Sequence, residues 1–190
     1  MSKYDTRVPF YFPPRSGTLK LDPRVVKELF GCRFVEEHRN ILCLGRAGLG
    51  KTRIAKAIAH AACLADYSVL CVHAADMVEE LHASHADRTF KRAFRRFVKP
   101  EVLLIDEFGY EPFNSEATNY LFRLVSARHR QGSIVLTANT GFSKWRNLFP
   151  SEATAVATVD RLVDAATILR FTGKSFRQPK NIVGAPLEDD

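Results

Sequence analysis

The octapeptide from Gly45 to Thr52 is the feature that most constrains what this chain can fold into. Its sequence, Gly-Arg-Ala-Gly-Leu-Gly-Lys-Thr, fits the pattern G-x-x-x-x-G-K-[ST], in which the backbone N–H groups of a glycine-rich loop surround a polyphosphate. The apolar run from Ile41 to Leu44 precedes it as a buried strand would. An apolar face with helical spacing follows it, formed by Ile54, Ala55, Ile58, Ala59, Ala62 and Cys63. This order of strand, loop and helix favours a phosphate-binding loop over an ordinary glycine-rich turn.

Every residue of the octapeptide is expected to contact a bound nucleotide, namely Gly45, Arg46, Ala47, Gly48, Leu49, Gly50, Lys51 and Thr52. The glycines allow the backbone to close around the phosphates, and the start of the following helix favours an anion. Lys51 would reach the β- and γ-phosphates, and the hydroxyl of Thr52 would bind Mg²⁺. The expected ligands are therefore ATP and Mg²⁺.

The composition fits a single domain without a membrane segment. A chain of 190 residues with 46% hydrophobic content can bury one core and is too short for two domains of ordinary size. No apolar run approaches the roughly 18 to 20 residues of a membrane span, and the N-terminus lacks the apolar core of a signal peptide. We therefore expect a cytoplasmic protein. The cysteines, Cys32, Cys43, Cys63 and Cys71, contain no C-x-x-C pair and are expected to be reduced, buried and free of metal.

Strand and helix patterns alternate along the chain. Strands are expected over residues 41–44, 67–72, 102–105, 133–137 and 167–171. Helices are expected after the capping residues Asp22 and Asp76, over residues 88–98, through residues 117–128, and over residues 151–164. The alternation predicts an α/β P-loop fold with a mostly parallel sheet of five strands and helices on both faces.

Asp106 and Glu107 directly follow the third apolar run. Both acids are therefore expected at the carboxyl end of the sheet, where ligands bind in this architecture. Asp106 would hold Mg²⁺ together with Thr52, and Glu107 would accept a proton from the attacking water as a general base. The alternative is a solvated acidic pair at the end of a strand.

Two polar residues further along the chain are candidates for the same site. Asn139 follows the fourth strand, where it would polarise the water or sense the γ-phosphate, or else cap a turn. Arg161 lies in the helix before the last strand. It is a candidate to stabilise charge on the transferred phosphoryl group from a neighbouring subunit. A surface ion pair with Asp160 or Asp164 is the alternative.

A stripe of basic residues is the second distinctive feature. Its members fall on one helical face and are Arg88, Lys91, Arg92, Arg95, Arg96 and Lys99. They nearly equal the formal net charge of +7, so the positive charge is concentrated in one segment. Such a stripe suits a phosphate backbone, because it supplies regularly spaced cations without reading base edges. A solvated basic face with no partner is the alternative.

Several motifs together resemble the IstB-like ATPases, a family of AAA+ proteins related to the bacterial helicase loader DnaC. The motifs are the octapeptide, Leu103 to Tyr110, Leu136 to Asn139 with Phe142 to Trp145, Asp160 to Leu162, and Gly173 to Arg177. The resemblance covers roughly residues 20–178. It implies an AAA+ ATPase domain over residues 22–178, preceded by an arm over 1–21 and followed by a tail over 179–190, with no C-terminal lid subdomain.

The resemblance also implies roles and partners. Asn139 is the counterpart of the sensor-1 residue of the family, and Arg161 is its candidate arginine finger. The segment with the basic stripe corresponds to a region that contacts DNA. Members of the family assemble into ATP-dependent oligomers on double-stranded DNA and stimulate a transposase, which is the leading expectation for this chain.

Three other functions remain open from the sequence. A DnaC-like loader would have the same chemistry and bind a replicative helicase instead of a transposase. A nucleotide-gated DNA-binding module would bind ATP with little turnover. A small-molecule P-loop kinase would carry arginines in a lid over the nucleotide.

Overall fold

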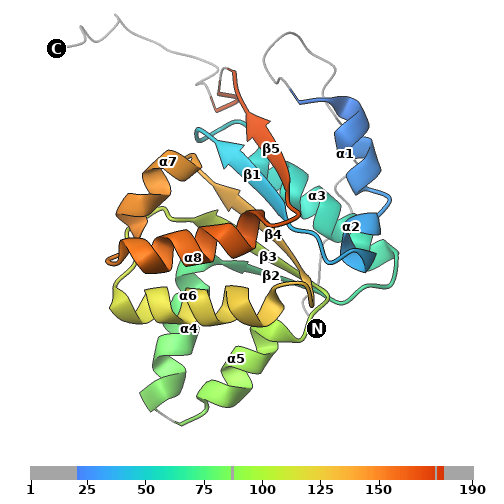
Figure 1. Cartoon of the computed structure of the whole chain (residues 1–190). Helices are drawn as coiled ribbons and strands as arrows, with labels where there is room; N and C mark the ends of the chain where they lie inside the picture. The colour runs from blue at the N-terminus through green and yellow to red at the C-terminus, as the bar shows by residue number, and fades with distance from the viewer. Residues whose placement is uncertain (1–20, 87, 174, 178–190) are drawn as a thin grey trace, which may run out of the picture.

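The computed structural model describes residues 21–86, 88–173 and 175–177, which form a five-stranded sheet covered by helices (Figure 1). The spatial order of the strands is β2-β3-β4-β1-β5, and every pairing is parallel. The strands are β1 (Ile41–Gly45), β2 (Val69–His73), β3 (Val102–Phe108), β4 (Ser133–Ala138) and β5 (Thr167–Phe171). The predicted α/β fold is thereby confirmed. Apart from Leu21, the expected arm lies outside the described residues, as does the expected tail.

The helices form two layers, one on each face of the sheet. Helices α1 (Pro23–Leu29), α2 (Arg33–Glu36) and α3 (Lys51–Leu64) pack on one face. The other face is covered by α4 (Ala74–Ala86), α5 (Phe90–Val98), α6 (Ser115–Arg128), α7 (Phe142–Trp145), the 3₁₀ helix η1 (Arg146–Leu148) and α8 (Glu152–Val163). Successive side chains of a strand point to opposite faces, so β1 supplies both cores. Ile41 and Cys43 belong to the first, and Leu42 and Leu44 belong to the second.

The ends of two helices test the predicted caps. Asp22 caps α1, because its carboxylate accepts a hydrogen bond from the backbone N–H of Arg24 at 2.9 Å. The prediction for Asp76 was wrong, since α4 begins at Ala74, directly after the last residue of β2. Asp76 therefore lies in the first turn of α4, where a carboxylate still favours the helix dipole.

The predicted burial of the cysteines holds only in part. Cys32 and Cys43 are buried and Cys71 is half-buried, whereas Cys63 is exposed. Burial raises the pKa of the Cys43 thiol to about 12, so this group stays protonated at neutral pH. Cys63 lies near the end of α3, one position past the buried face that Ala62 completes.

The last residue of α7 is part of the core. Trp145 is fully buried, and its indole N–H donates to the carbonyl of Thr140 at 3.2 Å. The residues described beyond β5 form no helix. No helix in the described ranges has the length and apolar character needed to cross a membrane.

Candidate functional site

The predicted phosphate-binding loop joins β1 to α3 at the carboxyl edge of the sheet. Gly48 and Gly50 have φ of 78° and 85°, in the left-handed region that favours glycine. A Cβ on Gly48 would lie 2.0 Å from Ser175 Oγ, so this position also needs the absence of a side chain. Gly50 is the N-cap of α3, which places Lys51 and Thr52 at the first two positions of the helix. The helix N-terminus thus faces the loop, as anion binding requires.

Lys51 links the loop to the end of β4. Its side chain is only 6% exposed, and Nζ donates to the carbonyl of Arg46 and to Asn139 Oδ1, each at 2.8 Å. Burial lowers the pKa of Lys51, while the nearby carboxylate of Asp106 opposes this shift. An ammonium group that is already partly desolvated interacts strongly with a phosphate.

Asp106 is the centre of a buried polar cluster. Its side chain is 3% exposed, and Oδ1 accepts hydrogen bonds from the hydroxyls of Thr52 at 2.9 Å and Thr137 at 2.5 Å. Lys56 Nζ lies 3.9 Å from the other carboxylate oxygen, Oδ2. The hydroxyl and the carboxylate predicted to hold a metal are therefore adjacent, and oxygen atoms of these kinds are the ligands that Mg²⁺ prefers.

Glu107 projects from a distorted part of β3. The strand was predicted to end at Ile105, but it continues to Phe108, with a shift in its register against β4 between these two residues. Glu107 has φ of 60°, and its backbone N–H donates to Thr137 Oγ1 at 3.0 Å. The irregularity turns the Glu107 side chain into solvent, where its Oε2 lies 3.8 Å from His73 Nδ1.

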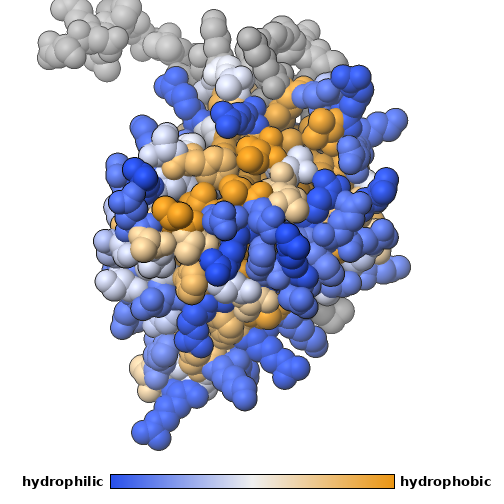
Figure 2. All heavy atoms as spheres, viewed as in Figure 1, coloured by the Kyte–Doolittle hydropathy of each residue, from blue (hydrophilic) through white to orange (hydrophobic). Residues whose placement is uncertain are grey.

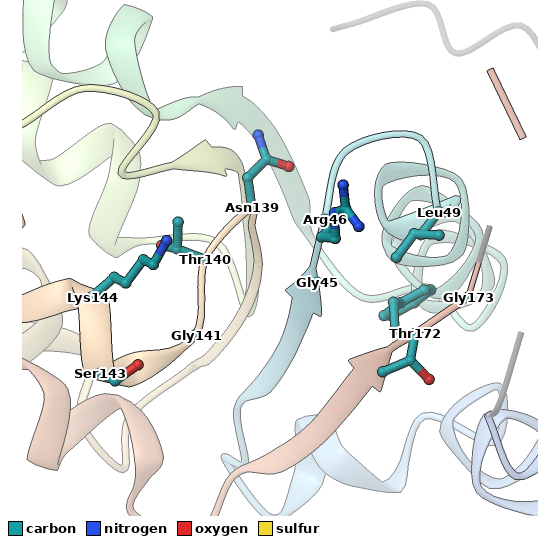
Figure 3. A pocket seen from close by; sticks show the side chains of 11 residues that line it. Gly45, Arg46, Leu49, Asn139, Thr140, Gly141, Ser143, Lys144, Thr172 and Gly173 are labelled. Carbon is teal, nitrogen blue, oxygen red and sulfur yellow. The ribbon is translucent and has the colours of Figure 1, made fainter. Parts of the chain in front are cut away.

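A cleft of about 410 Å³ opens beside the phosphate-binding loop (Figure 3). Its walls come from the loop, from the segment between β4 and α7, and from the end of β5. The lining residues are Gly45, Arg46, Leu49, Asn139, Thr140, Gly141, Ser143, Lys144, Phe171, Thr172 and Gly173. Figure 3 shows Asn139 and Arg46 on opposite sides of the opening. Of the remaining octapeptide residues, Leu49 is buried and Ala47 is exposed.

Arg161 lies on α8, and its contacts are with its own helical layer. Its guanidinium donates to the carbonyl of Ala157 at 2.8 Å and stacks over the ring of Phe122, with a distance of 5.1 Å to the ring centre. Within the described residues, the predicted alternative of an ion pair with Asp160 or Asp164 does not occur. Asp164 instead pairs with His129 and Arg130.

The basic stripe lies mainly on α5, which is at the bottom of the molecule in Figure 1, beside α4. The helix starts at Phe90, so the placement of Arg88 on the helix was wrong: this residue lies before it with φ of 60°. Lys91, Arg92, Arg95, Arg96 and Lys99 remain together, and all five are exposed. Arg96 also pairs with Glu80 of α4. Figure 2 shows hydrophilic side chains projecting over α4 and α5.

The apolar face of α5 packs against its neighbours as predicted. Phe97 is fully buried, and the rings of Phe90 and Phe94 stack at 5.5 Å. The guanidinium of Arg123, on α6, covers both rings, at 4.8 and 5.3 Å from their centres. Arg123 is exposed on α6 beside the apolar side of α5, a contact that the linear pattern could not reveal.

Three contacts of the nucleotide site were missed by sequence reasoning. Thr137 bonds to Asp106, Lys56 lies near the same carboxylate, and His73 lies beside Glu107. Thr137 and His73 each lie at or next to the carboxyl end of a strand, so a search for polar residues at these ends would have found both. Lys56 is one helical turn after Thr52, and no local pattern distinguishes it from other exposed lysines.

Comparisons with known proteins agree with this geometry. A sequence model of the family described as IstB-like ATP binding protein matches residues 15–183. The ATP-binding protein of insertion sequence IS21 from Pseudomonas aeruginosa is 36% identical over 177 residues, covering 90% of this chain and 67% of the relative. The corresponding protein of IS5376 from Geobacillus stearothermophilus is 34% identical over 157 residues, covering 83% of this chain and 62% of the relative. The chain thus spans about two thirds of these relatives.

Solved structures share the fold at low sequence identity. The structure of DnaI has a TM-score of 0.69 at 22% identity, covering 80% of this chain and 86% of that one. The DnaC helicase loader has a TM-score of 0.64 at 14% identity, covering 78% and 87%. DnaA from Aquifex aeolicus, bound to AMPPCP, has a TM-score of 0.65 at 17% identity, covering 78% and 44%. These similarities place the described domain among the P-loop AAA+ folds.

Proposed function

Because the chain belongs to the family of IstB-like ATP-binding proteins, we propose that it hydrolyses ATP to ADP and phosphate and assists a transposase on double-stranded DNA. One observation carries the hydrolytic part of the proposal: the hydroxyl of Thr52 lies 2.9 Å from the carboxylate of Asp106, with Glu107 exposed next to it. The phosphate-binding loop alone is enough to bind a nucleotide. Hydrolysis also needs a group that activates water, and the Glu107 carboxylate beside the phosphate site can do so.

Lys51, Thr52 and Asp106 bind and orient the phosphates in this proposal. Thr52 and Asp106 would hold Mg²⁺, which when bound neutralises charge on the phosphate oxygens. The Lys51 ammonium has only donors, so the atom of Asn139 that faces it is Oδ1. The amide nitrogen of Asn139 is then directed away from Lys51, as a donor for a γ-phosphate oxygen or for the attacking water.

Glu107 acts as the general base. Its carboxylate accepts a proton from a water molecule as the water oxygen bonds to the γ-phosphorus. The bond from that phosphorus to the β–γ bridging oxygen breaks, and ADP leaves with the electron pair. The exposure of the Glu107 side chain supports this role, since water must reach it.

DNA contact is assigned to Lys91, Arg92, Arg95, Arg96 and Lys99, with Arg88 as a neighbouring cation. These side chains are exposed, and α5, which carries most of them, lies away from the carboxyl edge of the sheet in Figure 1. They would neutralise phosphates of the duplex without reading its bases. The neighbouring Glu80 supports a smaller contribution from Arg96, because it already pairs with that guanidinium.

Self-association is proposed because Arg161 lies on α8 without an ion-pair partner among the described residues. From there it would serve as an arginine finger in the active site of a neighbouring copy, within an ATP-dependent oligomer. Phosphoryl transfer benefits from such a cation by about 10³ to 10⁵ in rate.

The test measures phosphate release by the purified chain with and without duplex DNA, and its binding to candidate partners. Stimulation by DNA together with capture of a transposase supports the proposal. Capture of the replicative helicase in place of the transposase supports a DnaC-like loader. Tight ATP binding with turnover no greater than that of Glu107→Gln would identify a nucleotide-gated module and refute the hydrolytic function.

A further inference from the structure

Arg128, the last residue of α6, is a buried cation that the nucleotide chemistry does not use. Its side chain is 1% exposed. Burial lowers its pKa to about 10, so the guanidinium remains protonated at neutral pH. Within the described residues it pairs with no carboxylate and instead donates to five backbone carbonyls. A charge buried among carbonyl oxygens alone requires well-defined geometry, because each displaced carbonyl weakens its stabilisation.

The five carbonyls join α5 to the sheet. Nη1 donates to Phe97 at 3.0 Å and Val98 at 2.8 Å, the last two residues of α5, and to Pro100 at 2.8 Å in the connection to β3. Nη2 donates to Glu101 at 3.2 Å and to Ser133, the first residue of β4, at 2.9 Å. The final carbonyls of a helix lack partners within it and favour a cation. Arg128 therefore caps α5 from another helix.

We propose that Arg128 is a positioning residue for the DNA-binding surface, because it fixes the end of α5 against β3 and β4 and so sets the direction of the basic stripe. This inference rests on the proposed DNA contact by α5. Phe97 is the only fully buried side chain of that helix. Without the guanidinium, the end from which Arg95, Arg96 and Lys99 project would be held by apolar packing alone, chiefly that of Phe97 and the partly buried Val98.

The location of Arg128 separates this role from nucleotide binding. Its carbonyl partners lie at the starts of β3 and β4, whereas Asp106 and Asn139 lie at or beyond their carboxyl ends. Strands of this length put roughly 15 to 20 Å between the two edges. A change at Arg128 should therefore disturb DNA binding and leave the affinity for ATP nearly unchanged.

Gly132 offers a second variant that keeps the charge. A Cβ at this position would lie 2.9 Å from Arg128 Nη2 and 3.3 Å from the carbonyl of Glu101. Gly132→Ala should therefore push the guanidinium away from Glu101. Arg128→Lys keeps a cation with three donors in place of the four N–H bonds of Nη1 and Nη2, since Nε of Arg128 is buried without a hydrogen-bond partner among the described residues. It should restore part of what Arg128→Met loses.

The experiment compares these three variants with the unaltered full-length chain. It measures duplex affinity and its salt dependence by fluorescence anisotropy, ATP affinity by calorimetry, and amide hydrogen exchange over residues 95–101. For Arg128→Met we expect about tenfold weaker duplex binding and a log-log salt slope that is shallower by about 1, as when one phosphate contact is lost. ATP affinity should stay within about twofold, and exchange at the end of α5 should be faster. For Arg128→Lys we expect the duplex affinity, the salt slope and the exchange rates to fall between those of Arg128→Met and those of the unaltered chain.

Two outcomes would overturn the inference. One is unchanged duplex affinity and salt slope in a folded variant whose amides at the end of α5 exchange faster, since Arg128 would then be only structural. The other is equal loss of ATP and duplex binding in all three variants. Should Arg128→Met fail to fold, Arg128→Lys and Gly132→Ala carry the same comparison. Failure of the proposed DNA contact is recognised separately, because stripe variants such as Arg95→Gln would then bind the duplex normally.

Discussion

Lys51 Nζ lies 2.8 Å from Asn139 Oδ1, so one hydrogen bond joins the start of α3 to the end of β4 across the phosphate-binding loop. The two residues are separated by 88 positions in the sequence. This contact holds the Lys51 side chain over the loop without any contact to a phosphate. A preorganised cation loses less conformational freedom on binding than a mobile one.

Removal of the Lys51 ammonium should weaken ATP binding by about one to two orders of magnitude. A hydrogen bond to a charged group contributes about 1.5 to 3 kcal/mol, which corresponds to roughly 10- to 150-fold in affinity, and Lys51→Ala also leaves Asn139 unpaired. Calorimetric titration with ATP measures the change. Lys27→Ala is the control, since this lysine is exposed on α1 and contributes nothing to the nucleotide site as described. Near-normal affinity of Lys51→Ala would exclude the assigned role of the loop.

Replacement of Glu107 by glutamine should stop turnover while ATP remains bound. General base catalysis contributes about 10²- to 10⁴-fold, so steady-state phosphate release should fall by that factor. The variant should accumulate as ATP-bound oligomers on DNA, which sedimentation would detect. Glu111→Gln, a change at an exposed acid four residues later, should have no such effect. Unaltered turnover of Glu107→Gln would remove Glu107 as the base.

The stripe on α5 should make DNA binding strongly dependent on salt. Neutralisation of about four phosphates predicts a log-log slope of about −3.6 for the duplex binding constant. The double change Lys91→Gln and Arg92→Gln should make the slope shallower by about 1 to 2. Lys27→Gln with Arg33→Gln removes two exposed cations from the opposite layer and serves as the control. A weak salt dependence of the unaltered chain is the result that contradicts a phosphate contact.

Arg161→Ala should suppress turnover by about 10³- to 10⁵-fold if the finger acts between subunits. Mixing this variant with Glu107→Gln should restore part of the activity, because the second protein lends its intact Arg161 to sites that retain Glu107. Arg146→Ala, which removes an exposed arginine paired with Glu152, is the control. Failure to restore activity at every mixing ratio would argue against a finger supplied in trans.

The order and type of the elements could be predicted because local patterns determine them. The strand at residues 167–171 was predicted with its observed limits, and the apolar run before Gly45 was placed correctly. The start of α4 was missed because β2 passes into the helix without a loop, so a capping residue was sought where none is needed. Arg88 was misplaced because the basic periodicity begins two residues before Phe90, the first residue of the helix.

The contacts between distant residues could not be predicted in the same way. Periodicity assigned Arg128 to the helix of residues 117–128 but says nothing of the five carbonyls that surround its guanidinium. The bond from Thr137 to Asp106 likewise depends on the pairing of β3 with β4. Such contacts follow from the order of strands in the sheet, which the alternation of elements leaves open.

The left-handed backbone conformation of Glu107 makes this residue costly for the stability of the fold. A residue with a side chain at φ of 60° carries strain of about 1 to 3 kcal/mol, which glycine would relieve. The most stable residue at this position of the chain is therefore one that cannot do chemistry. A variant selected only for stability at this position would therefore lose the proposed general base.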